Sequence, residues 1–289
     1  MGLIGGSLAL ALKKAHFVSH IVGVGRTQAS LDEALKLGVV DAICVADGTQ
    51  ANLDAALKDA DLVLIAAPVA QTVGILQSIK PHLNNQTLIT DAGSTKGDVL
   101  ACAKTILGAQ FSQFVGGHPI AGAEKSGVSA ANADLFLGKN VVLTPETLNS
   151  PQTNKDAVLA VNALWQACGA NVTEMSAEAH DSIFAAVSHL PHLLAFALVD
   201  DIASRPNAAE LFSFAASGFR DFTRIAGSSP EMWRDISLAN RTALLSEINV
   251  FENELSQLKQ LLKVEDGAGL QALFERASVA RNAWANSKK

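Results

Sequence analysis

The feature that most constrains the fold is an alternation of short apolar runs with helical stretches through residues 1–175. The runs at 21–25, 61–67, 87–90, 141–144 and 171–175 have the length and composition of β-strands, and helical patterns lie between them. The run at 61–67 (DLVLIAA) is continuously apolar, as expected for a strand buried on both faces. This alternation predicts a parallel α/β sheet of the Rossmann-like type.

The first residues resemble part of a dinucleotide-binding fingerprint. Gly2 and Gly5 fit its second and third glycines, and a helical stretch follows at residues 8–14. In such a motif the N–H groups at the start of the helix receive a pyrophosphate. The first glycine and the strand before it are missing, so we expect the chain to begin late, at an internal methionine of a longer protein. A sheet without that central strand has two unpaired edges.

The end of the second strand bears on the choice of cofactor. An Asp or Glu there holds the ribose hydroxyls of NAD, but here Gly25 is followed by Arg26 and Thr27. A guanidinium pairs well with a 2′-phosphate, which favours NADP, whereas the alternative is a solvated arginine. The residues we expect to bind NADP or NAD are Gly2, Leu3, Ile4, Gly5, Arg26, Thr27, Ala67, Pro68 and Ser94.

Residues 115–122 (VGGHPIAG) place His118 in what reads as a glycine-rich loop. An imidazole held there suits a general base or a hydrogen-bond acceptor, and the alternative is a turn that happens to carry a histidine. Ser94 lies beyond the carboxyl end of the strand at 87–90, where open α/β sheets bind ligands. It is also a possible N-cap of the next helix, and both roles are compatible. A further helix is expected to start at Ser150 and Pro151.

From residue 176 to 289 the pattern is helical, which predicts an all-α second domain. Within it, His189 and His192 (SHLPH) with His180 and Asp181 upstream suggest either a metal site or a substrate contact. Pro191 argues against one regular helical face and no further ligand completes a set, so we expect no metal and favour the substrate contact. The remaining alternative is a buried, hydrogen-bonded histidine.

Two arginines in the helical half are candidate carboxylate receptors. Arg224 and Arg234 either pair with Asp221 and Asp235 at the surface or face a cleft, where a guanidinium accepts a carboxylate bidentately. Ser229 and Pro230 are expected to start the helix that carries Arg234.

A heptad-spaced apolar stripe follows near the C-terminus. It is either the inner stripe of a helix bundle or a subunit contact, and we expect both, with a homodimer formed through the helical domain. Its members are Leu244, Ile248, Phe251, Leu255, Leu258 and Leu262.

Composition narrows the possible partners of the protein and its compartment. A formal charge of −6 offers no basic surface for nucleic acid. The three cysteines are widely spaced and fit a reducing cytosol, and no apolar run in the sequence suggests a membrane span. We therefore expect a cytoplasmic protein.

Taken together, six motifs resemble those of the prephenate/arogenate (cyclohexadienyl) dehydrogenases of tyrosine biosynthesis. They occur in family order over nearly the whole chain, at residues 2–7 (GLIGGS), 90–97 (TDAGSTKG), 114–127 (FVGGHPIAGAEKSG), 187–192 (VSHLPH), 219–226 (FRDFTRIA) and 232–236 (MWRDI). The resemblance implies oxidative decarboxylation, with hydride transfer to NAD(P). The choices of prephenate or arogenate and of NAD or NADP stay open.

The resemblance also implies roles for single residues. His118 matches the catalytic residue that accepts a hydrogen bond or proton from the substrate hydroxyl, and Ser94 matches a serine that orients it or touches the same hydroxyl. Arg224 matches the receptor of the ring carboxylate and His189 a substrate contact. Trp233 and Arg234 match supporting or cross-subunit contributors to substrate binding.

Three competing functions remain. One is a dehydrogenase of similar architecture acting on a β-hydroxy acid, but that class uses a lysine in the helical half and none lies between Lys155 and Lys259. Another is a dimeric paralogue that has lost cofactor binding. The third is a metal hydrolase built on His180, Asp181, His189 and His192.

Overall fold

The computed structural model describes residues 1–46, 50–123, 125–147 and 152–287. These residues form two compact units, Met1–Arg241 and Thr242–Lys289, which we call unit 1 and unit 2. Unit 1 holds the α/β part of the chain together with the helices up to residue 241. The helical domain expected at 176–289 therefore spans the end of unit 1 and all of unit 2.

The described strands of unit 1 form two sheets. β1 and β2 make a parallel pair, and the other strands form one sheet in the order β3-β4-β5-β6-β7, parallel throughout except between β5 and β6. The predicted strands at 21–25, 61–67, 87–90, 141–144 and 171–175 are confirmed, with bounds that differ by at most two residues at either end. The strands are β1 (Val22–Gly25), β2 (Ala42–Val45), β3 (Leu62–Ile65), β4 (Leu88–Asp91), β5 (Phe114–Pro119), β6 (Asn140–Thr144) and β7 (Asn171–Glu174).

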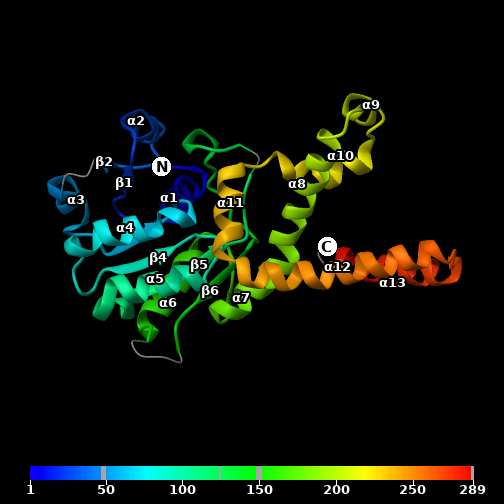
Figure 1. Ribbon diagram of the computed structural model, residues 1–289. Coiled ribbons are helices and arrows are strands. Elements are labelled where there is room, and N and C mark those ends of the chain that lie inside the picture. Colours follow the sequence, from blue (N-terminus) through cyan, green and yellow to red (C-terminus); the bar gives the residue numbers. More distant parts are fainter. Residues whose placement is uncertain (47–49, 124, 148–151, 288–289) are drawn as a thin grey trace. The chain divides into compact units, whose positions relative to one another are not determined.

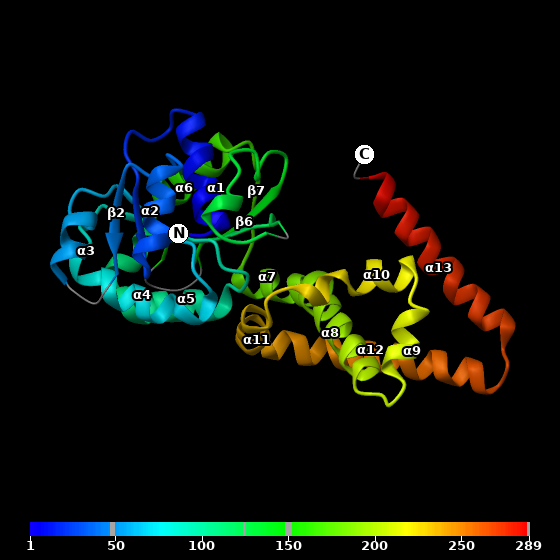
Figure 2. The same cartoon turned by 90° about the horizontal axis from the view of Figure 1, so that it is seen from above.

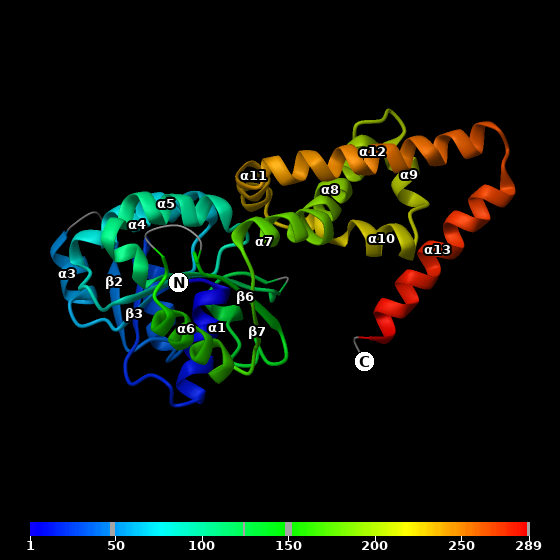
Figure 3. The same ribbon diagram turned by 90° about the horizontal axis from the view of Figure 1, so that it is seen from below.

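Helices cover both faces of the five-stranded sheet (Figures 2 and 3). α1 (Leu3–Lys14) and α6 (Lys155–Ala167) cover one face, and α4 (Thr72–Ile79) and α5 (Gly97–Leu107) cover the other. Adjacent residues of β5 face opposite ways, with Val115 in the core under α1 and α6 and Phe114 in the core under α4 and α5. The Rossmann-like α/β fold is thereby confirmed.

The remaining elements of the α/β part are short. α2 (Gln28–Lys36) and α3 (Gln50–Leu57) accompany β1 and β2, and 3₁₀ turns lie at η1 (Val69–Gln71), η2 (Lys80–His82), η3 (Gly108–Gln113) and η4 (Val128–Ala130). The expected helix start at Ser150 and Pro151 lies outside the described residues. α6 is capped instead by Asn154, whose side chain accepts the N–H of Asp156 at 2.9 Å.

The division into two sheets falls where a Rossmann-like sheet has its central strand. In the strand order of such a fold that strand lies between the neighbours represented here by β1 and β3. Among the described residues β3 pairs with β4 alone, and Leu62, Val63 and Leu64 are only half-buried. The expectation that this run is buried on both faces is therefore wrong for three of its four strand residues, because one side of β3 has no neighbouring strand in the described part of the chain. The predicted pair of unpaired edges is confirmed for the described strands.

The helical part of unit 1 begins with a continuous helix, Ala177–Ala203. It comprises α7 (Ala177–Phe184), a π-helical segment η5 (Ala185–His189) and α8 (Leu190–Ala203) (Figure 1). By length and composition this helix is apolar enough to cross a membrane, which corrects the expectation that no such run exists. It carries the fully buried His180 and His189, which pack against other parts of unit 1.

Shorter helices complete unit 1, namely α9 (Ala208–Ser213), α10 (Ser217–Thr223), the 3₁₀ turn η6 (Arg224–Gly227) and α11 (Pro230–Ala239). The predicted start of α11 is confirmed, because the Ser229 hydroxyl accepts the N–H of Met232 at 3.3 Å with Pro230 in the first turn.

Unit 2 consists of two helices in its described part. α12 (Arg241–Lys263) carries the heptad stripe, and α13 (Gly267–Asn286) follows it. Leu244 is buried, but Leu255 and Leu262 are 49% and 63% exposed and line an open groove with Leu258. In the far half of the stripe, Leu255 and Leu262 are thus left exposed by the described residues.

Candidate functional site

His118 lies in strand β5, not in the glycine-rich loop expected from the sequence. It is paired with Val142 of β6 in an antiparallel register. The neighbouring glycines serve close packing instead of loop formation. A Cβ on Gly117 would lie 2.8 Å from the carbonyl oxygen of Asp91, and a Cβ on Gly116 would lie 2.5 Å from the Thr144 hydroxyl. The sheet therefore fixes the backbone of His118 more firmly than a loop would.

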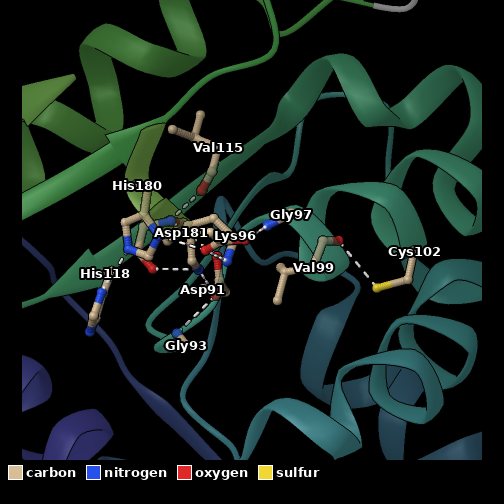
Figure 4. Close-up of polar contacts among 12 residues, drawn as sticks. Asp91, Gly93, Lys96, Gly97, Val99, Cys102, Val115, His118, His180 and Asp181 are labelled. Atoms are coloured by element: carbon tan, nitrogen blue, oxygen red, sulfur yellow. Dashed lines mark hydrogen bonds and ion pairs between the residues drawn. The ribbon is translucent and has the colours of Figure 1, made fainter. Parts of the chain in front are cut away.

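Two residues of α7 continue from His118 in a chain of hydrogen bonds (Figure 4). His118 Nδ1 lies 2.8 Å from His180 Nε2, and His180 Nδ1 lies 2.8 Å from Asp181 Oδ1. The Asp181 carboxylate also accepts the backbone N–H groups of Lys96 at 2.9 Å and Gly97 at 2.8 Å. We call His118, His180 and Asp181 the histidine relay.

The relay determines which ring nitrogens carry protons. An ionised carboxylate only accepts, so His180 donates from Nδ1 and its Nε2 is the acceptor in the neutral ring. His118 must then donate from Nδ1, which leaves its Nε2 without a proton. The relay therefore presents His118 Nε2 as a hydrogen-bond acceptor or base.

Burial and charge keep the relay in this state. Burial, followed by the influence of His180, holds the pKa of His118 well below 6.5, and burial likewise lowers the pKa of His180. Burial alone would raise the pKa of Asp181, but the hydrogen bonds from His180, Gly97 and Lys96 bring it below its ordinary value. Neutral histidines next to an ionised carboxylate are thus the resting form at neutral pH.

A buried ion pair fixes the backbone next to the relay. The Lys96 ammonium, which has no exposed surface, contacts the Asp91 carboxylate and donates to the carbonyl oxygen of Gly117 at 2.8 Å. Asp91 also accepts the N–H groups of Gly93 at 2.8 Å and Gly117 at 3.0 Å. These bonds tie β5, next to His118, to the loop that follows β4.

Ser94 is half-buried in that loop, and its position corrects the expectation that it caps the next helix. It does not cap α5, whose N-cap residue is Lys96 and whose first N–H groups are bound by Asp181. Within the described chain Ser94 forms no hydrogen bond to His118, whose Nδ1 is bonded to His180, and its contact with the substrate hydroxyl stays a prediction.

The expected cofactor-binding residues converge at the carboxyl ends of the parallel strands. α1 begins at Leu3 with Gly2 as its N-cap, and a Cβ on Gly5 would lie 3.3 Å from Ala66 Cβ at the end of β3. Ala67 and Pro68 continue from β3, and Ser94 follows the adjacent β4.

Two further observations test the fit to a dinucleotide. Within the described chain the N–H groups of Leu3, Ile4 and Gly5 donate to no other residue, which leaves them available to a pyrophosphate. Arg26 and Thr27 are exposed at the end of β1. Leu3, Ile4, Gly5, Arg26 and Thr27 therefore fit a dinucleotide cofactor.

The helical candidates divide into a buried set and an exposed set. His189 and Trp233 are 1% and 8% exposed, and the Trp233 ring stacks on His192 with a centroid separation of 3.6 Å. Arg224 is exposed on η6, near enough to His192 to lower its pKa after the larger effect of burial. Arg234 is bound to Asp235, with Nε 2.8 Å from Oδ1, so the surface-pair alternative describes its contacts.

Sequence reasoning missed several residues of this site. The sequence indicates His180 and Asp181 only as companions of His189 and His192 in a metal site or a substrate contact, and it assigns no role to Lys96 or Asp91. Among the described residues no group of three or more His, Cys, Asp or Glu side chains is placed to hold a metal ion. The available signal was the DAGSTK segment, in which an acidic residue and a lysine flank the loop at a strand end.

Comparisons with known proteins agree with this architecture. Residues 8–174 match the family model described as the prephenate dehydrogenase nucleotide-binding domain, and residues 176–276 match the prephenate dehydrogenase dimerization domain. A prephenate dehydrogenase of Bacillus subtilis is 40% identical over 284 residues, which covers 98% of this chain and 74% of that protein.

Solved structures extend the likeness. A prephenate dehydrogenase from A. aeolicus in complex with hydroxyphenyl propionate and NAD+ has a TM-score of 0.88 and 37% identity, covering 97% of this chain and 94% of that chain. A Synechocystis arogenate dehydrogenase has a TM-score of 0.81 and 27% identity, covering 98% and 97% respectively. The chain belongs to the prephenate dehydrogenase family.

Proposed function

We propose that this protein catalyses the NAD(P)-dependent oxidative decarboxylation of prephenate, arogenate or both, in tyrosine biosynthesis. The observation that carries the proposal is the histidine relay, which presents a neutral, unprotonated His118 Nε2. This group belongs to a chain whose relatives act on these two substrates. The same relatives, with the NAD+ complex among them, support a nicotinamide cofactor.

His118 is the proposed catalytic residue. Its Nε2 accepts the hydrogen bond of the substrate hydroxyl as the carbon that bears the hydroxyl loses its hydride. The bound nicotinamide supplies the hydride acceptor. Carbon dioxide leaves as the ring becomes aromatic, so the reaction is strongly downhill and the protein mainly aligns the reactants and manages one proton.

The other site residues have supporting roles in this proposal. Ser94, in the loop after β4, contacts the same hydroxyl and the cofactor. Arg224 binds the ring carboxylate and His189 a second polar group of the substrate, while Trp233 packs beside His189. Arg234, held by Asp235, contributes to the shape of the substrate site next to Trp233.

The cofactor is proposed to lie across the N-terminus of α1. Gly2, Leu3, Ile4 and Gly5 receive its pyrophosphate there, and Ala67 and Pro68 lie along its path toward Ser94. Arg26 and Thr27 favour the 2′-phosphate of NADP, because they follow β1 directly in the sequence where an Asp or Glu would bind the ribose of NAD.

A homodimer is proposed from the dimerization-domain match at residues 176–276 and from the exposed leucines of α12. The cytoplasm is the proposed compartment, as for a biosynthetic enzyme that uses a soluble cofactor.

The test is a set of four assays that pair prephenate or arogenate with NAD or NADP and follow reduced nicotinamide. Turnover in at least one pair is expected, and the four rates rank substrate and cofactor. His118→Asn is expected to lower kcat by about 10²-fold or more, the usual contribution of a positioned base. Absence of turnover in all four pairs contradicts the proposed reaction, and a wild-type kcat in His118→Asn contradicts the role of His118.

A further inference from the structure

Asn240, the residue that ends α11, connects the two histidine-bearing parts of the continuous helix. It is 4% exposed, and its Nδ2 lies 2.8 Å from the main-chain oxygen of Asp181 and 3.0 Å from Nδ1 of His189. Asn240 therefore contacts one member of the histidine relay and a separate buried histidine at the same time.

Chemistry fixes the direction of both hydrogen bonds. A main-chain carbonyl only accepts, so the amide group that faces Asp181 must be the NH₂ of Asn240 and not its oxygen. The second hydrogen of this NH₂ points to His189 Nδ1, which must then be the unprotonated nitrogen. Burial lowers the pKa of His189 to about 4, so the ring is neutral at pH 7 and its one proton is on Nε2.

This proton has no acceptor in the described protein. His189 is 1% exposed, and its Nε2 is buried without a hydrogen-bond partner. The indole Nε1 of Trp233, whose ring meets His189 edge to face at 6.0 Å, is also buried without a partner. Buried donors without acceptors destabilise a protein unless a ligand satisfies them. Both groups only donate, so the ligand that fits them offers an oxygen acceptor.

We propose that Asn240 is a positioning residue that holds His189 as an Nε2–H donor toward an acceptor oxygen of the substrate, a carboxylate or carbonyl group. The inference rests on the proposed function for the identity of the ligand, but not for the state of the ring. In this arrangement the protein sets two neutral histidines to opposite tasks. His118 accepts from the substrate through Nε2, whereas His189 donates to it through Nε2.

The first test reads the ring itself. Nitrogen-15 NMR of histidine-labelled, unliganded protein, with His189 assigned by its absence in His189→Gln, distinguishes the two neutral forms of the ring. We expect the form protonated at Nε2. The form protonated at Nδ1 in the wild-type protein would overturn the proposal, and this measurement needs neither turnover nor a stable Asn240 variant.

The second test changes the polarity of the contact. Asn240→Asp replaces a donor by a group that accepts, so His189 is expected to gain a proton on Nδ1 and KM for the substrate to rise about tenfold or more, with kcat changed less. Asn171→Asp is the matched control, because Asn171 Nδ2 also donates to a carbonyl oxygen, that of Gly138 at 3.2 Å, but on the exposed edge strand β7.

The outcomes separate the two proposals. An unchanged tautomer and an unchanged KM in Asn240→Asp would overturn the role of Asn240 while wild-type turnover upholds the reaction. If the wild-type protein turns over neither substrate but His189 has the expected tautomer, the proposed function fails and the role of Asn240 as the residue that sets the ring stands.

Discussion

Asp181 and His180 are neighbours in sequence whose side chains are also bonded to each other, with Oδ1 2.8 Å from Nδ1. Asp181 thereby sets the proton of His118 through its carboxylate, and it faces Asn240 through its main-chain oxygen. One residue at the start of the helical part thus belongs to the histidine relay and also contacts the Asn240 that binds His189. It also caps α5, because its carboxylate binds the N–H groups of Lys96 and Gly97.

The first prediction concerns Asp181→Asn. The Asp181 carboxylate accepts hydrogen bonds from three N–H groups, but an amide has only one acceptor oxygen. The relay therefore loses its fixed proton arrangement. We expect kcat to fall by about 10²-fold or more, as when the acid that orients a catalytic histidine is neutralised. The loss of the cap should reduce the free energy of unfolding by about 1 kcal/mol.

The control for this change is Asp134→Asn, which removes an exposed ion pair with Lys14 and should change neither quantity beyond about 0.5 kcal/mol or twofold. Steady-state rates and urea unfolding measure the two effects. A variant of Asp181 with the kcat of the wild type would show that the relay does not set the state of His118.

The second prediction concerns pH. His118 acts in its neutral form, and burial holds its pKa well below 6.5, so protonation removes activity only at pH values well below that of an ordinary histidine. The acid limb of kcat/KM should therefore lie well below pH 6.5, with a plateau above it. A rate profile with its acid midpoint at 6.5 would contradict the assigned protonation state. Circular dichroism at each pH excludes unfolding as the cause of the decline.

The third prediction separates binding from chemistry at Arg224. Replacing it by alanine removes the proposed carboxylate receptor, so KM should rise about tenfold to a hundredfold with a smaller change in kcat. Arg220→Ala makes the same chemical change at an exposed position of α10 and should leave both constants near the wild type. Equal effects of the two variants would contradict the role of Arg224 as the carboxylate receptor.

The fourth prediction concerns the uncovered stripe of α12. Leu255→Glu places a charge among the leucines of the groove and should convert a dimer into a monomer, as measured by analytical ultracentrifugation. Leu159→Glu on α6 is the control, because Leu159 is 67% exposed in unit 1 and is not a member of that stripe. A dimer that survives Leu255→Glu would place the subunit contact elsewhere.

Much of the fold was predictable because local patterns carry it. Apolar runs bounded by turn residues identified β1, β3, β4, β6 and β7, and the capping pair at Ser229 and Pro230 identified the start of α11. Strand β5 was misread because its two glycines resemble a loop. Their role is visible only when the Cβ atoms they lack are measured against Asp91 and Thr144.

The site was less predictable because its contacts are long-range. The sequence indicates His118 as a candidate, but its partner His180 lies 62 residues further along the chain. Asn240 is 51 residues beyond His189, and no spacing rule links the two. Lys96 and Asp91 are close in sequence, yet their buried contact depends on β5 lying over the loop that carries Lys96.

The π-helical segment η5 has a consequence for how the histidines share one site. An α-helix turns about 100° per residue, so His180 and His189, nine positions apart in sequence, would lie on opposite faces of a regular helix. The wider turn at Ala185–His189 absorbs about one residue and brings the two rings to within roughly a quarter turn. Regular winding of the same nine positions would rotate α8 about its own axis and carry His189 away from Asn240. Deleting Val187, which is 68% exposed, would leave eight positions of regular helix and keep the quarter-turn relation between the two rings. The wider turn thus acts as a phase adjustment, matching the angular position of one histidine to that of another along the same helix.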